Sequence, residues 1–303
     1  MRKIIPLCLF FAIVTINLAQ SQPKDSIPQP PQNPGQLDSF LSKTEETISK
    51  EPLQAKQRVR KALSIIHQTA TDSLLPKAYY ILGYSHYNQN NYDSAKFYFT
   101  QSITHSKNLQ IRSREALALN RLGNTYQLMG AYDKALLHYQ QALQINEEIQ
   151  KKEEIARSYT NIGSVYSTLG KYEKAIQFHL KALSIYEETG AKEGKAWTTL
   201  NIARLFKLNE SYTKALDYLD RSLILYQSIA KETGVETGIT LCLKEYGLIY
   251  VKSGELEKAL NYSRKALERN QQTRNKYGIA NSYANLGRIY YKKGSYNKSL
   301  DYL

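Results

Sequence analysis

The stretch Ala116–Leu143, ALALNRLGNTYQLMGAYDKALLHYQQAL, decides the fold, because the chain repeats its pattern at a fixed interval. One glycine lies inside the first helical half, a second glycine follows that half, and two alanines mark the second half. Self-similarity at a period of about 20–50 residues indicates a repeat architecture. The recurring residues are Gly123, Tyr126, Gly130, Tyr132, Ala135 and Ala142, which return as Gly163, Tyr166, Gly170, Tyr172, Ala175 and Ala182.

Each recurring small residue has a physical reason. A glycine inside a helix costs about 1 kcal/mol relative to alanine, so its return at the place of Gly123 indicates a close helix crossing that has no room for a side chain. Gly130 fits the left-handed position that ends a helix. Ala135 and Ala142 lie two turns apart on one face and would meet the first helix. The pattern therefore predicts tightly packed pairs of helices.

The interval between the interior glycines is 40 residues except for one step of 44. The extra four residues fall between Ser228 and Gly238, which predicts a longer loop there. Glu210 stands where other units have the turn glycine, so either Glu210 or its neighbour Asn209 must take the left-handed conformation, at a cost of roughly 1–2 kcal/mol. The interior positions to which these intervals refer are Gly83, Gly123, Gly163, Ala203, Gly247 and Gly287.

A decayed unit precedes this row. We interpret Leu37–Ile66 as a degenerate N-terminal pair of helices, because its alanines keep the spacing while Lys43 takes the place of the glycine.

This pattern resembles the tetratricopeptide repeat, and the resemblance covers roughly residues 76–303. The resemblance implies an all-α fold: an α-solenoid of about six helix–turn–helix units of 40–44 residues plus the degenerate pair. It also implies a right-handed superhelix whose inner surface is made by the first helix of each unit. The residues that carry it are Leu122, Gly123, Tyr126, Gly130, Tyr132, Ala135 and Ala142.

Residues 1–21 read as a secretory signal, with a basic start, the apolar run Ile4–Ile16 and small residues for cleavage after Ala19 or Ser21. The apolar run is short for a membrane span, which needs about 20 residues, although an uncleaved anchor is the alternative. We therefore expect an exported protein, in the periplasm or on the extracytoplasmic face of the inner membrane. Only Cys242 remains after signal removal, which predicts a packed thiol and no intramolecular disulfide.

The remainder divides into a proline-rich spacer, residues 22–36, and the repeat array, residues 37–303. The array stops within a repeat, since Ser295–Leu303 matches Ser211–Leu219 but lacks the helical residues that follow the earlier copy. Repeat arrays need polar caps, so we expect this sequence to be truncated inside its last repeat. A natural stop with an unstable last unit is the alternative.

A polar stripe runs along the first helices at positions that share one face. The resemblance implies that asparagines of this stripe grip the main chain of a peptide, since their amides both donate and accept hydrogen bonds. Arginines would meet carboxylates and Trp197 would give an apolar contact. The alternatives are an asparagine row that bonds to neighbouring helices and a tryptophan that packs between repeats, and Glu245 breaks the row. The predicted peptide-binding residues are Arg121, Asn124, Arg157, Asn161, Trp197, Asn201, Arg204, Asn281, Asn285 and Arg288.

No catalytic or metal-binding constellation is present in the sequence. The five histidines lack metal-ligand spacing, and every glycine is explained by the repeat or a loop. We therefore expect no enzyme activity, no cofactor and no metal within these residues. The net charge is +14, or +12 without the two basic residues of the signal, which favours acidic partners.

The sequence thus predicts an exported scaffold that binds a protein or a peptide, acidic ones included, and no nucleic acid. Membrane attachment would come only through a missing C-terminal segment or an uncleaved signal. The alternative is the extracytoplasmic sensor region of a longer membrane signalling protein, a histidine kinase or a DNA-binding regulator whose output domain lies beyond residue 303. That alternative rests on similarity to the sensory parts of bacterial histidine kinases that carry such arrays.

Overall fold

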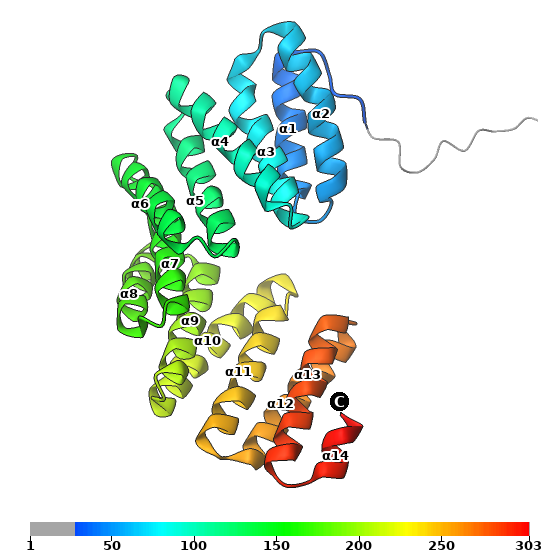
Figure 1. Ribbon diagram of the computed structural model, residues 1–303, viewed down its shortest axis with the longest axis vertical. Coiled ribbons are helices and arrows are strands. Elements are labelled where there is room, and N and C mark those ends of the chain that lie inside the picture. The colour runs from blue at the N-terminus through cyan, green and yellow to red at the C-terminus, as the bar shows by residue number, and fades with distance from the viewer. Residues whose placement is uncertain (1–27, 303) are drawn as a thin grey trace, which may run out of the picture.

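The computed structural model describes residues 28–302, which form helices joined by short turns and contain no strand (Figure 1). The predicted signal peptide, residues 1–21, lies outside these residues. The helices come in consecutive pairs, which confirms the predicted α-solenoid. The first helices of the pairs are α1 (Pro34–Thr47), α3 (Leu75–Asn88), α5 (Arg112–Leu128), α7 (Lys152–Thr168), α9 (Lys192–Leu208), α11 (Thr237–Ser253) and α13 (Lys276–Lys292). The second helices are α2 (Pro52–Thr69), α4 (Tyr92–Asn108), α6 (Tyr132–Glu148), α8 (Tyr172–Thr189), α10 (Tyr212–Thr233), α12 (Leu256–Gln272) and α14 (Tyr296–Asp301), and a 3-10 turn, η1 (Asp72–Leu74), precedes α3.

The pairs stack into an open arc, from α1 and α2 at one end to α13 and α14 at the other (Figure 1). Each helix packs on the helix before it and the helix after it. From α3 to α11, each first helix also touches the next first helix. The first helices therefore lie on the inside of the curve, and the second helices cover its outer face.

The interior glycines set how closely the two helices of a pair approach. A Cβ atom added to Gly123 would stand 2.6 Å from the ring of Tyr139, and one added to Gly83 would stand 2.6 Å from the ring of Phe99. Both rings are fully buried. The predicted close crossing is therefore confirmed, and the missing side chain of each glycine makes room for a large side chain of the second helix.

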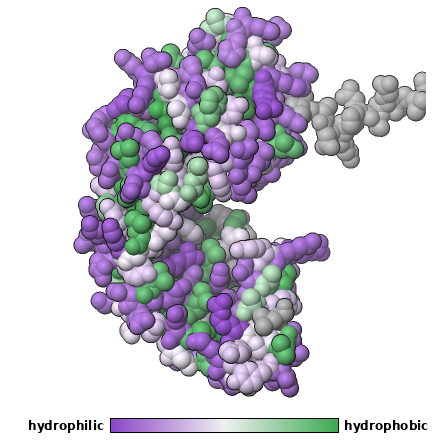
Figure 2. Space-filling view, viewed as in Figure 1, coloured by the Kyte–Doolittle hydropathy of each residue, from purple (hydrophilic) through white to green (hydrophobic). Residues whose placement is uncertain are grey.

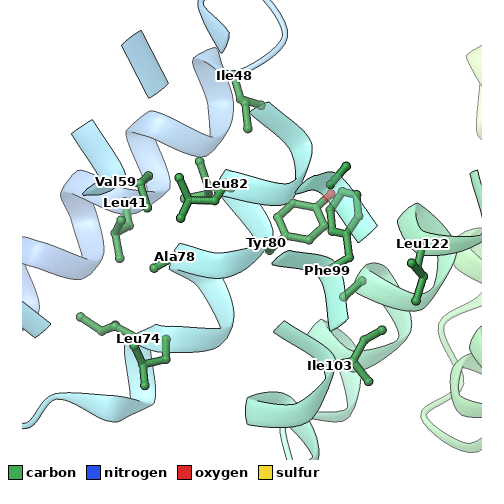
Figure 3. Close-up of a cluster of buried hydrophobic side chains, with 14 of the residues drawn as sticks. Leu41, Ile48, Val59, Leu74, Ala78, Tyr80, Leu82, Phe99, Ile103 and Leu122 are labelled. Carbon is green, nitrogen blue, oxygen red and sulfur yellow. The ribbon is translucent and has the colours of Figure 1, made fainter. Parts of the chain in front are cut away.

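The core is a series of clusters between consecutive helices, as repeat architecture requires. Figure 3 shows the N-terminal cluster, in which Leu41 and Val59 of the first pair meet Leu82 of α3, while Tyr80 and Phe99 pack farther along. The degenerate pair thus packs on the first regular unit through the same core.

The turn residues adopt the left-handed conformation predicted for them. Gly130 has φ 76° and Gly170 has φ 70°. Glu210 also takes this conformation, with φ 56°, whereas Asn209 has φ −87°. The expectation that Asn209 could take the strained place is wrong, because the closing hydrogen bond from Ser211 N–H to Phe206 O (2.9 Å) fixes which position turns left-handed.

The four extra residues lengthen a helix rather than a loop, which corrects the sequence prediction. Helix α10 continues through Ser228 to Thr233 and ends at Gly234, whose φ is 73°. The connection to α11 is then only Gly234–Glu236, as short as the other turns between units. An insertion of about one turn keeps the buried face of a helix in register, so the helix can absorb it.

Gly123→Ala should lower the free energy of unfolding by up to about 2 kcal/mol. The added methyl collides with the Tyr139 ring, and overpacking costs about 1–3 kcal/mol, which the better helix propensity of alanine offsets by about 1 kcal/mol. Urea unfolding followed by circular dichroism would measure the change. In a Tyr139→Ala background the same substitution should no longer destabilise; an equal cost in both backgrounds would contradict the crossing model.

Candidate functional site

The concave side of the array carries the predicted stripe, and we call the surface of the first helices on this side the inner groove. Figure 2 shows the hollow that this side forms between the N-terminal and C-terminal halves. The predicted residues lie on α5, α7, α9 and α13, on four of the helices that line the groove. Their surroundings differ from one helix to the next, and these surroundings decide which side chains are available to a ligand.

At the N-terminal end of the groove, arginines are held by tyrosines of α3. Arg121 donates a hydrogen bond from Nε to the Tyr80 hydroxyl (3.2 Å), and its guanidinium lies 4.2 Å from the centre of the Tyr84 ring. Arg114 lies 5.1 Å from the Tyr80 ring and pairs with Glu45 of α1 at 2.7 Å. Arg121 therefore keeps its charge without a carboxylate partner among residues 28–302, but its position is fixed by packing.

Asn124 supports the glycine crossing. Its Oδ1 atom lies 2.6 Å from the hydroxyl of Tyr139, which also reaches Gln127 at 2.9 Å. Burial raises the pKa of Tyr139, so the phenol remains a neutral donor. The side-chain oxygen of Asn124 therefore takes part in the packing of the two helices. The role of Asn124 as a ligand contact stays a prediction.

In the middle of the groove, Asn161 and Asn201 lie one repeat apart, on α7 and α9, and both are half-buried. Asn161 makes no side-chain hydrogen bond within residues 28–302, whereas Asn201 Oδ1 accepts one from Arg204 at 3.3 Å. Arg157 is exposed and pairs with Glu154 at 3.2 Å. The alternative of bonding to a neighbouring helix is thus not seen for Asn161.

A buried carboxylate organises the neighbouring region. Glu245 of α11 is 5% exposed and receives hydrogen bonds from Arg204 Nε (2.8 Å) and Lys207 Nζ (2.5 Å). Burial alone would raise the pKa of Glu245, but the charges and hydrogen bonds of Lys207 and Arg204 outweigh burial, so the pKa lies below its ordinary value. Arg204 also lies over the exposed ring of Trp197, 5.4 Å from the ring. The carboxylate that Arg204 meets is therefore supplied by the chain itself.

At the C-terminal end, Asn281 and Asn285 of α13 line a cleft of about 200 Å³ between α11 and α13. Asn281 donates its amide to Tyr277 O at 3.0 Å, and Asn285 makes no side-chain hydrogen bond within the described residues. Arg288 is exposed beyond the cleft. The structure brings Asn281 and Asn285 together at one cleft but leaves the ten predicted residues spread along the groove.

The sequence reasoning missed the other residues that line this cleft, among them Lys244 of α11, Asn270 of α12 and Gly278 of α13. A signal was present in the sequence. Eleven residues after the first regularly spaced alanine of the second helix, α8 and α10 carry Tyr186 and Tyr226, whereas α12 carries Asn270. An alignment of the second helices with each other reveals this substitution, whereas the predicted polar stripe contains positions of the first helices alone.

The buried titratable groups outside the groove have structural roles. Burial lowers the pKa of His179 to about 4, so this ring is neutral where it packs against Gly163. Burial raises the pKa of the Cys242 thiol to about 11, and the thiol lies 3.7 Å from Ser222 Oγ. A neutral, enclosed thiol is a poor nucleophile, in agreement with the packed cysteine expected from the sequence. Within residues 28–302, no group of three His, Cys, Asp or Glu residues could hold a metal ion.

Comparison with protein families shows what the repeat is. Tetratricopeptide repeat models match residues 114–188 and 236–303 and, through a second model, residues 76–109, together more than half of the chain. The chain belongs to the tetratricopeptide repeat family. A comparison with curated protein sequences found no match.

Several solved structures share this fold. BtubC from P. vanneervenii is 20% identical with a TM-score of 0.62, and the match covers 70% of this chain and 88% of BtubC. The apo form of RapI is 17% identical with a TM-score of 0.69, over 87% of this chain and 93% of RapI. A Rap protein complexed with competence and sporulation factor is 16% identical with a TM-score of 0.57, over 87% and 76%.

Among residues 28–302, no helix combines the length and the apolar character that crossing a bilayer demands.

Glu245→Gln should destabilise this tetratricopeptide repeat array by roughly 2–4 kcal/mol at pH 7, because Arg204 and Lys207 would lose their buried partner. A lowered pKa in the folded state means that the stabilisation is present above pH 4.5, the ordinary value, and is lost as pH falls below it. Urea unfolding between pH 3 and pH 7 should therefore show a flatter pH dependence for the variant. Glu268→Gln, an exposed carboxyl of α12, is the matched control, and equal losses in both variants would contradict the role of Glu245.

Proposed function

We propose that this chain is an exported tetratricopeptide repeat scaffold that binds an extended protein or peptide segment along its inner groove. The observation that carries the proposal is the asparagine row, Asn161, Asn201 and Asn285, which recurs at one register on α7, α9 and α13 and lies half-buried on the groove side. Amides that recur on one face suit the main-chain groups of an extended ligand, because they both donate and accept hydrogen bonds. Scaffolding of protein–protein contacts is the role that the family supports, and the Rap complex is one protein of this fold with a bound factor.

The charges of the groove favour an acidic segment. Arg157 and Arg204 are already paired with Glu154 and Glu245. Three positively charged side chains have no carboxylate partner among the described residues: Arg121, Lys244 and Arg288. The free positive charges therefore lie toward the two ends of the groove, where acidic side chains of one extended ligand would meet them.

Asn161→Ala combined with Asn201→Ala should weaken the binding of capped peptides rich in Asp and Glu by about tenfold. Each lost hydrogen bond contributes about 0.5–1.5 kcal/mol, and 1.4 kcal/mol corresponds to a factor of ten. Isothermal titration calorimetry with the full chain at low salt would measure the dissociation constants.

The matched control removes two exposed amides from second helices, Asn108→Ala combined with Asn261→Ala. This control should bind as the unmodified protein does. Unchanged binding in the Asn161/Asn201 double variant would contradict the groove proposal. The absence of binding by every acidic peptide would contradict it as well.

Export rests on the sequence of residues 1–21, with its basic start and apolar run. An antibody against residues 100–250, applied to cell fractions, should detect a band near 34.7 kDa or slightly below it in the periplasmic fraction. A cytoplasmic band would contradict export. A much larger band in the membrane fraction would contradict the free scaffold and would support the sensor hypothesis.

A further inference from the structure

The cleft between α11 and α13, which we call the α11–α13 cleft, reaches past the first helices to α12. Its inner end is formed by Ala266 and Asn270 of α12, and its sides by Leu241 of α11 and Gly278 of α13. Helix α13 packs less closely against α11 than the earlier first helices pack against each other. The residue of the second helix that faces each gap differs along the array.

The two preceding gaps are filled by tyrosines of the protein itself. Tyr226 of α10 lies against Gly238, where an added Cβ atom would stand 2.0 Å from its ring, and Tyr186 of α8 lies against Gly194 in the same way at 2.5 Å. Tyr226 is half-buried and packs against the core cluster that contains Leu200 of α9 and Cys242 of α11. Each of these rings therefore lies between two first helices and closes the gap.

The α11–α13 gap has the glycine but lacks a ring from the second helix, and the one ring in its lining is the exposed Tyr277 of α13. Gly278 takes the place of Gly238, and Asn270 takes the place of Tyr226. The carboxamide of Asn270 lies against Gly278, within 2.1 Å of where a Cβ atom would be, and its Nδ2 donates to Ser282 Oγ at 3.1 Å. An asparagine is shorter than a tyrosine by most of the ring, so the cleft begins where the ring would have been.

The groups around this cleft suit an aromatic ring. Leu241 and Ala266 give apolar walls, and the planar carboxamide of Asn270 gives a flat end. Lys244 is the one charged residue in the lining, and it makes no ion pair within residues 28–302. Elsewhere the chain repeatedly places lysines over rings, for example Lys214 at 5.6 Å from Phe206 and Lys258 at 5.2 Å from Tyr250. A cation beside a ring is an attractive arrangement.

We propose that the α11–α13 cleft binds an aromatic side chain of the partner segment, in the place that Tyr186 and Tyr226 fill in the two preceding gaps. This inference rests on the proposed function and adds its specificity: the partner is an acidic segment that carries an aromatic anchor. Aromatic anchors in central pockets are the residues that contribute most to the affinity of protein interfaces. Lys244 stands beside the ring, and Asn281 and Asn285 face the ligand main chain at the cleft mouth.

Two capped heptapeptides test the anchor, one with tyrosine between two runs of three glutamates and one with alanine in its place. Isothermal titration calorimetry suits the comparison, because a fluorophore would add a ring of its own. The full chain should bind the tyrosine peptide at least about tenfold more tightly than the alanine peptide. Equal affinities would overturn the inference and leave the proposed function standing, whereas the absence of binding by both peptides would overturn both.

Asn270→Tyr should abolish the preference for the tyrosine peptide, because it rebuilds the tyrosine–glycine pair of the preceding gaps and fills the cleft. Asn261→Tyr, the same change at an exposed position of α12, should keep the preference. If Asn270→Tyr folds, as judged by circular dichroism, and still prefers tyrosine by tenfold, the inference is wrong.

Lys244→Gln provides a second variant that leaves the packing intact. It should reduce the preference for tyrosine by about threefold or more, since the ring loses its cation, whereas Lys252→Gln, on the same helix outside the cleft, removes the same charge and should leave the preference unchanged. Equal tyrosine preferences in the two lysine variants would overturn the assignment of this cleft.

Discussion

The close crossing of the two helices within each pair is the constraint on which the rest of the structure depends. At Gly123 the first helix has no side chain, and the ring of Tyr139 lies directly on its backbone. The hydroxyl of that ring then reaches through to Asn124 and Gln127 on the groove side. One missing side chain thus fixes both the distance between the helices and the orientation of polar groups at the inner groove. Because the crossing recurs, the array curves in one sense, and the first helices gather on its inside.

The groove is less uniformly basic than the charge of the chain suggests. The +14 formal charge is partly offset in the middle of the groove, because Glu245 pairs with Arg204 and Lys207. Tyrosine rings fix the position of Arg121 but leave its charge in place. The middle of the groove is therefore a fixed polar surface of amides and an exposed tryptophan. Ordering mobile side chains costs entropy on binding, so these internal contacts would lower that cost for the proposed ligand as well as stabilise the fold.

The gaps between first helices vary although the repeat is regular. A single register on the second helices carries Asn146, Tyr186, Tyr226 and Asn270 in turn, and the structure has clefts at the two asparagines and packed rings at the two tyrosines. Repeat architecture permits this variation, because each unit packs only on its neighbours and a local opening does not disturb the others. Clefts that could distinguish ligands are thus created by residues of the second helices, behind the polar stripe of the first helices.

The sequence by itself determined the helical pairs, their order, the interior glycines and the turns, because a fixed period of small residues leaves few packings open. It also placed the asparagine row on one face, since that follows from helix geometry alone. Only the tertiary structure decided what each polar residue touches: that Glu210 rather than Asn209 turns left-handed, that α10 absorbs the extra turn, and that Arg204 meets Glu245. The physical reason is that contacts between repeats join residues about forty positions apart, and their geometry depends on side-chain length and helix spacing, which a local pattern does not contain.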